Sequence, residues 1–175
     1  MVTHFYTASS LDGFIATDEH SLQWLFDQDF DMDGPMAYPQ FIEGIGALVM
    51  GASTYEWLLR NQESWDYTQP AWVFTHRKLN KPEGADVRFT SGAPSEVFES
   101  IAHSSKGKDL WVMGGGDLAG QFAEAGLLDE IWVQFAPVML GSGRPLFTRP
   151  IQLKLIEVVR NRGFVCAHHR VVKDQ

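Results

Sequence analysis

Residues 109–128, which read DLWVMGGGDLAGQFAEAGLL, contain the most informative pattern in this chain. A strand-like apolar run at 110–113 is followed by three consecutive glycines, 114–116, and then by an apolar periodicity typical of a helix. Glycines let a main chain approach a ligand closely, and a helix N terminus attracts anions. The stretch therefore predicts an anion site at a strand–turn–helix junction, with a ligand-free turn as the structural alternative. Three consecutive glycines favour the anion site over the ligand-free turn. A turn alone needs fewer glycines, and each additional one costs conformational entropy on folding.

The length and composition indicate one globular domain spanning 1–175. The 45% apolar fraction, with twelve Phe and six Trp, is enough for a well-packed core. No apolar run is long enough to span a bilayer, and the first residues lack the pattern of a signal peptide. The single cysteine, Cys166, excludes an internal disulfide and a cysteine-based zinc site. We therefore expect a cytoplasmic protein without a metal.

The formal net charge of −8 disfavours negatively charged macromolecules and membranes as binding partners. It repels nucleic acid and anionic membranes at long range, so neither is an expected partner. A phosphate-bearing small molecule is compatible with this charge, because the site that binds it is local.

Strand-like and helix-like segments alternate along the chain. Strands are expected at 2–8, 14–16, 47–50, 71–75, 86–90, 110–113, 129–138, 151–160 and 164–172. Helices are expected at 21–26, 36–44, 55–59, 94–104 and 118–128. The order predicts an α/β fold with a mixed, mostly parallel sheet, helices on its faces and a β-hairpin at the C terminus.

Three of these strands end in groups suited to phosphate. Residues 51–54 offer hydroxyls at a helix start, 75–77 offer a guanidinium, and 114–117 offer bare backbone. Each segment alone fits a structural turn equally well. Because open α/β sheets bind ligands at the carboxyl ends of their strands, the repetition predicts a dinucleotide.

Five motifs in order cover nearly the whole chain. They are ASSLDGFIA at 8–16, SLQW at 21–24, VMGASTYE at 49–56, VMGGG at 112–116, and DE at 129–130 with APVMLG at 136–141. With them the chain resembles the dihydrofolate-reductase-like superfamily. Within it, the chain is most similar to the C-terminal reductase domain of the bifunctional deaminase-reductase of riboflavin biosynthesis, as a stand-alone relative. The resemblance implies a three-layer α/β/α arrangement.

The resemblance also implies NADPH as cofactor, with NADH as the alternative. The nicotinamide end would lie by the first strand and its loop, the phosphates at the second-helix turn and the triple glycine, and the 2′-phosphate at 75–77. The implied cofactor-binding residues are Ala8, Ile15, Gly51, Ser53, Thr54, Thr75, His76, Arg77, Met113, Gly114, Gly115, Gly116, Asp117, Leu118 and Gln121. Members of the family often carry an arginine where this chain has Ala52, so selectivity for NADPH would rest on Arg77.

The implied chemistry is hydride transfer to a pyrimidine- or pterin-like heterocycle, as in 5-amino-6-(5-phosphoribosylamino)uracil reductase or dihydrofolate reductase. A carboxyl group should donate the proton, but Ala37 occupies the position of the family's acid. The candidate acids are Asp12, Asp29, Asp31 and Asp33. Trp24, Phe26 and Gln134 are the expected substrate contacts; Gln134 stands where dihydrofolate reductases have a threonine, which argues against dihydrofolate.

The nature of the substrate and the activity itself stay open at this stage. The chain lacks the paired cysteines of a zinc deaminase, and no Lys or Arg precedes Arg60, which disfavours a phosphorylated substrate. A non-catalytic nucleotide- or ligand-binding protein with the reductase fold is the alternative function. The two C-terminal strands are the candidate surface for a homodimer.

Overall fold

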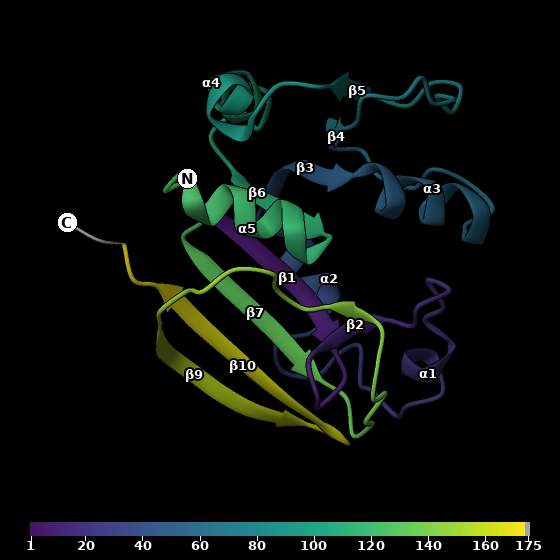
Figure 1. The fold of residues 1–175 in the computed structure, drawn as a ribbon, viewed down its shortest axis with the longest axis vertical. Coiled ribbons are helices and arrows are strands. Elements are labelled where there is room, and N and C mark those ends of the chain that lie inside the picture. Colours follow the sequence, from purple (N-terminus) through teal and green to yellow (C-terminus); the bar gives the residue numbers. More distant parts are fainter. Residues whose placement is uncertain (174–175) are drawn as a thin grey trace.

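The computed structural model describes residues 1–173, and an eight-stranded sheet forms its centre (Figure 1). The spatial order is β5-β4-β3-β6-β1-β7-β10-β9. The strands are β1 (Thr3–Ser9), β3 (Ile45–Gly51), β4 (Ala71–Phe74), β5 (Val87–Thr90), β6 (Asp109–Gly114), β7 (Glu130–Phe135), β9 (Leu153–Asn161) and β10 (Phe164–Val171). Neighbours from β5 to β7 are parallel, and the hairpin β9–β10 is antiparallel. The predicted mixed sheet with a C-terminal hairpin is confirmed.

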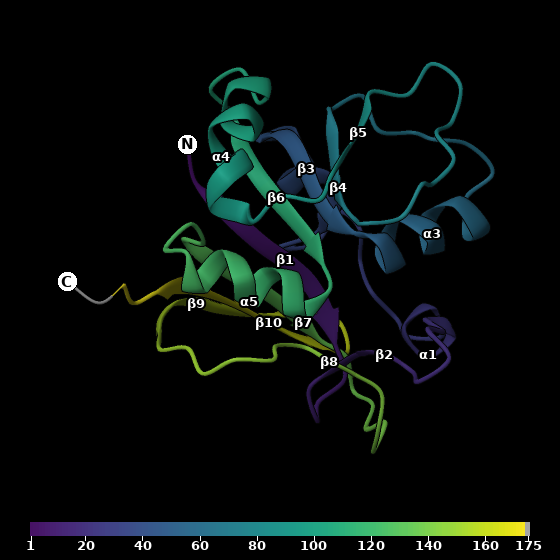
Figure 2. The same cartoon turned by 45° about the horizontal axis from the view of Figure 1, so that its top comes forward.

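Helices cover both faces of this sheet because its central strands are apolar on both sides. In β3, Ala47 and Val49 face a core that includes α4 (Pro94–Ser104) and α5 (Gly116–Glu124). Leu48 and Met50 face the opposite core, with α2 (Tyr38–Glu43) and α3 (Ala52–Asn61). Figure 2 shows α4 and α5 across the sheet from α3. The implied three layers are therefore present.

Several helix boundaries differ from the sequence-based expectation. Helix α3 begins at Ala52, earlier than predicted. Helix α5 ends at Glu124 and not at Leu128, and Gly126 just beyond it adopts a φ of 70°. Helix α2 is shorter than predicted, since Met36 adopts a φ of 57° outside the helical region. A short helix, α1 (Gln23–Phe26), precedes it.

A second, two-stranded sheet was only half predicted. Strand β2 (Phe14–Ala16) pairs with β8 (Arg144–Pro145), which aligns Ala16 with Arg144. This pairing brings the loop that follows β7 next to the loop that follows β1. Among residues 1–173, no helix combines the length and the hydropathy needed to cross a membrane.

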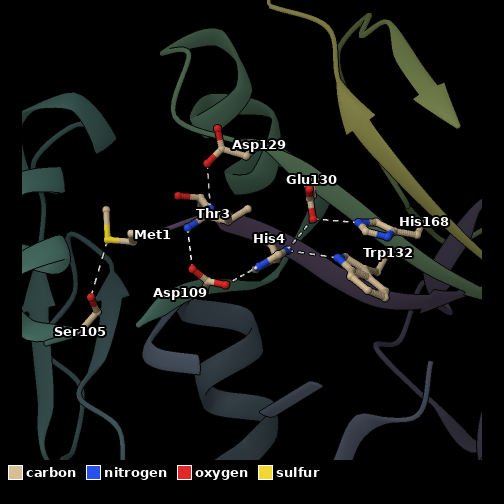
Figure 3. Close-up of polar contacts among 10 residues, drawn as sticks. Met1, Thr3, His4, Ser105, Asp109, Asp129, Glu130, Trp132 and His168 are labelled. Atoms are coloured by element: carbon tan, nitrogen blue, oxygen red, sulfur yellow. Dashed lines mark hydrogen bonds and ion pairs between the residues drawn. The ribbon is translucent and has the colours of Figure 1, made fainter. Parts of the chain in front are cut away.

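The two ends of the parallel strands carry different chemistry. At the amino ends of β1, β6 and β7 lies a buried polar cluster, in which His4 Nε2–H donates to Asp109 (3.2 Å) and Trp132 Nε1–H donates to His4 Nδ1 (3.1 Å) (Figure 3). Beside it, His168 Nε2–H donates to Glu130 (2.8 Å). In this cluster the polar side chains hydrogen-bond to one another. The open cleft lies at the carboxyl ends of the parallel strands.

Candidate functional site

A cleft of about 820 Å³ lies at the carboxyl ends of the parallel strands. Residues at or just beyond the ends of β3, β4, β5 and β6 line it, and Thr7 of β1 joins them. The small sheet β2–β8 contributes Ile15, Ala16 and Arg144. A volume of this size suits a ligand with several rings and phosphates.

Two helices start at the cleft without a side chain capping their N termini. The N-cap of α3 is Gly51 and that of α5 is Gly115, and neither helix start receives a side-chain cap. Their first backbone N–H groups therefore remain available to an anion. Helix α4 differs, because the Glu96 carboxylate accepts the N–H of Ala93 (2.8 Å) and Pro94 follows. The anion-binding capacity is thus concentrated at α3 and α5.

The three consecutive glycines serve three different purposes. Gly114 has a φ of 135°, which L side chains rarely adopt. A Cβ on Gly116 would lie 2.4 Å from the carbonyl oxygen of Leu146, so this position has to be small for packing. A Cβ on Gly115 would meet only Ile15 Cδ1, at 4.0 Å. Only Gly115 thus combines an ordinary φ with open space in the cleft, which is the arrangement a ligand approaching the backbone requires.

Asp117, in the first turn of α5, is held by several side chains. Gln121 Nε2–H donates to its Oδ2 (2.8 Å) and Arg149 Nη1–H donates to its Oδ1 (2.7 Å). The hydrogen bond from Gln121 and then that from Arg149 lower the pKa of this carboxyl. The Arg149 cation offsets the negative charge that Asp117 places beside an anion-binding helix start.

Most of the residues expected to bind a cofactor line the cleft. Those that do are Ile15, Gly51, Ser53, Thr54, Thr75, His76, Met113, Gly115, Gly116, Asp117, Leu118 and Gln121. Ala8 and Gly114 are absent from the lining, although their chain neighbours Thr7 and Gly115 belong to it.

Arg77 also lies outside the lining. Its guanidinium donates to both carboxylate oxygens of Glu56 on α3, at 3.1 and 2.7 Å. The Arg77 side chain is therefore directed towards α3 and not into the cleft, and its role in cofactor selectivity stays a prediction.

Asp12 is fully engaged in holding a loop. It accepts hydrogen bonds from Ser10 Oγ (2.6 Å) and from the N–H groups of Leu140 (3.0 Å) and Gly141 (2.6 Å). These bonds, that of Ser10 foremost, lower the pKa of Asp12 to about 2. The carboxyl group is ionised at neutral pH and lies outside the cleft lining, so its position argues against a role as proton donor.

The other three candidate acids lie on the loop before α2, which packs against the C-terminal hairpin. Buried Asn161 fixes this loop, because its Nδ2 donates to the carbonyl of Asp31 (2.9 Å) and its Oδ1 accepts the N–H of Asp31 (2.9 Å). Asp29 pairs with Arg162 at 3.2 Å, and Asp33 is exposed. None of the three lines the cleft.

The expected substrate contacts also lie outside the lining. Trp24 packs against the small core formed by Phe164 and its neighbours. Gln134 is buried in β7, and its Nε2–H donates to the carbonyl of Met36 (3.3 Å). Phe26 is 62% exposed, and its ring lies 6.3 Å from that of Trp57, which does line the cleft.

Sequence reasoning missed several parts of the lining, among them 90–93 and Arg144. Residues 90–93 follow β5, which is the next carboxyl end along the sheet edge, and the strand order needed to see this is not encoded locally. Arg144 reaches the cleft through the pairing of β8 with β2, a contact between segments far apart in sequence.

Comparisons with known proteins agree with this fold. The uncharacterized protein YwjB of Bacillus subtilis is 32% identical over 146 residues, which cover 83% of this chain and 82% of that protein. A putative riboflavin biosynthesis protein of Shewanella sp. PV-4 superposes with a TM-score of 0.85, at 23% identity, over 99% of this chain and 100% of that one. A dihydrofolate reductase of Enterococcus faecalis, complexed with NADP(H), shares the fold at 15% identity, with a TM-score of 0.63 over 98% and 97% of the two chains. The family model described as "RibD C-terminal domain" matches residues 2–163, so the chain belongs to the RibD C-terminal domain family.

Proposed function

We propose that this protein is a reductase that uses a nicotinamide dinucleotide to transfer a hydride to a pyrimidine- or pterin-like heterocycle. The observation that carries the proposal is the convergence of two uncapped helix starts and Gly115 on one cleft. Membership of a reductase-domain family and the NADP(H)-bound dihydrofolate reductase among the neighbours of the fold support it.

The residues of the cleft fit a dinucleotide in an extended conformation. The N–H groups at the starts of α3 and α5, with the hydroxyls of Ser53 and Thr54, would hold the pyrophosphate. The nicotinamide would lie beside Thr7 and Ile15, and the adenosine at the ends of β4 and β5. A bound reduced nicotinamide supplies the hydride.

The chain contributes positioning at the nicotinamide end of the cleft. Ile15, Leu22 and Trp57 give that part of the cleft apolar and aromatic walls, suited to the faces of a flat heterocycle. Since none of the four candidate aspartates lines the cleft, water is the proposed source of the proton that accompanies the hydride. The riboflavin-pathway substrate is the best-defined candidate, and Arg144 in the lining offers a cation for its phosphate.

The position of the four aspartates also favours a second candidate function. A protein that binds a nucleotide without reducing anything needs the helix starts and the glycine but no proton donor. The two functions differ in whether bound NADPH or NADH is oxidised when a panel of pyrimidines and pterins is added.

A titration tests the proposal directly. We expect one molecule of NADH or NADPH per chain, with quenching of tryptophan fluorescence because Trp57 lines the cleft. Oxidation of the bound dinucleotide with at least one heterocycle supports the reductase, and binding without oxidation supports the second candidate. If neither dinucleotide binds, the reductase proposal is wrong.

A glycine variant locates the binding site. Gly115→Val places a branched side chain where the cleft is open, so it should abolish binding while the thermal unfolding stays cooperative. Gly44→Val is the matched control, because Gly44 lies at the end of α2 with its nearest neighbour at 3.8 Å and outside the cleft lining. Normal binding by Gly115→Val would contradict the placement of the pyrophosphate.

A further inference from the structure

The adenosine end of the cleft lacks the cation that a 2′-phosphate needs. Within residues 1–173, this end is lined by Phe74, Thr75, His76 and residues 90–93, with no lysine or arginine among them. A carboxylate lies there instead, because Glu96 Oε2 caps Ala93 and is the nearest atom, at 3.0 Å, to the position a Cβ would take on Gly92. An anion at this end therefore meets hydroxyls, the His76 imidazole and a nearby carboxylate, and no guanidinium or ammonium group.

The guanidinium of Arg77 is directed elsewhere. Arg77 comes directly after His76, which lines the cleft, but its two terminal nitrogens donate to both oxygens of Glu56. Its backbone N–H donates to Thr75 Oγ1 (3.0 Å), which fixes the turn that directs the side chain away. The hydrogen bonds between the two side chains stabilise both charges, because they lower the pKa of Glu56 and raise the pKa of Arg77.

A 2′-phosphate competes with Glu56 for the Arg77 guanidinium. The Arg77 side chain is 58% exposed, so the pair contributes little to folding stability. Its effect on ligand binding is different, because the contact occupies the Nη1–Nη2 edge of the guanidinium and directs it towards Glu56. A 2′-phosphate bound to Arg77 would also lie beside the Glu56 carboxylate, which repels it.

We propose that Glu56 determines dinucleotide specificity: by holding Arg77 in a two-point ion pair outside the cleft, it removes the cation for a 2′-phosphate. The chain consequently binds NADH about as well as NADPH. This inference rests on the proposed function and on the adenosine lying at the ends of β4 and β5.

Isothermal titration with NADH and NADPH at one fixed ionic strength tests the inference. The wild-type ratio of the two Kd values should be less than about tenfold, and Arg77→Ala should leave that ratio unchanged. Glu56→Gln frees the guanidinium to form charge-assisted hydrogen bonds, so the preference for NADPH should rise about tenfold. The double variant Glu56→Gln/Arg77→Ala should return to the wild-type ratio.

A second two-point ion pair, away from the cleft lining, provides the control. Arg88, in β5, donates to both carboxylate oxygens of Asp86, which directly precedes the strand, and both distances are 2.9 Å. Neither residue lines the cleft. Asp86→Asn changes the net charge by the same amount as Glu56→Gln and should leave the Kd ratio unchanged.

The possible outcomes separate the inference from the proposed function. A wild-type preference for NADPH of about tenfold or more that Arg77→Ala removes would overturn the inference, and so would an unchanged ratio in Glu56→Gln. In either case the binding of a dinucleotide would still support the proposed function. Binding of neither dinucleotide would contradict both.

Discussion

At the scale of single residues, aspartates that were candidate proton donors are engaged in holding loops outside the cleft lining. Asp12 illustrates this, because the family resemblance made it a candidate acid through its place in the loop expected beside the cofactor. Its carboxylate instead ties the loop after β1 to Leu140 and Gly141 beyond β7. A sequence cannot show this, since the partners are more than a hundred residues away.

Asp12→Asn should lower the melting temperature near neutral pH. The folded pKa of about 2 lies below the ordinary 3.8, so the stabilisation is complete above pH 4 and is lost as the pH falls towards 2. The difference in melting temperature between wild type and variant should therefore shrink over that window. Asp33→Asn, on an exposed loop, serves as the charge-matched control. A difference that stays constant from pH 7 to pH 2 would show that the ionised form of Asp12 has no such role.

At the scale of elements, α5 combines binding with close packing. Its start faces the cleft at Gly115, while Gly116 touches the carbonyls of Pro145 and Leu146 beside β8. The glycine run in the sequence predicted the junction correctly. The sequence could not show why each of the three positions is a glycine. Gly114 needs its positive φ, Gly116 needs room beside β8, and Gly115 leaves the cleft open.

Two alanine substitutions in α5 should have unequal effects. Gly116→Ala forces a Cβ to within 2.4 and 2.6 Å of two backbone carbonyl oxygens, which should lower the free energy of unfolding by about 1–3 kcal/mol. Gly120→Ala meets mainly the flexible Arg149 side chain, and alanine favours a helix interior, so the loss should be smaller. Urea denaturation compares the two. Equal losses would show that the contact with β8 is not what requires glycine at 116.

At the scale of the whole molecule, the parallel sheet separates a stabilising end from a binding end. The alternation of strands and helices predicted the fold class, the hairpin and three of the segments that line the cleft. The strand order, the β2–β8 pairing and the hydrogen bonds by which Asn161 holds the aspartate loop depend on long-range contacts. These are the features that decide which residues face the cleft, so the site was predicted less completely than the fold.

His4→Leu tests this separation. It removes the acceptor of Trp132 and the donor to Asp109 within a buried cluster, so the free energy of unfolding should fall by about 1–3 kcal/mol. The Kd for NADH should stay unchanged, because the cluster lies at the opposite ends of the strands. His103→Leu, at an exposed position of α4, controls for the loss of a histidine. A weakened Kd with unchanged stability would contradict the separation.

The central claim is that the cleft at the carboxyl ends holds a nicotinamide dinucleotide. A crystal structure of the protein grown with NADH or NADPH tests it most directly. We predict the pyrophosphate within hydrogen-bonding distance of the N–H groups at the starts of α3 and α5, against Gly115, with the nicotinamide beside Ile15. A dinucleotide bound elsewhere, or a cleft that stays empty at saturating ligand, would contradict the claim.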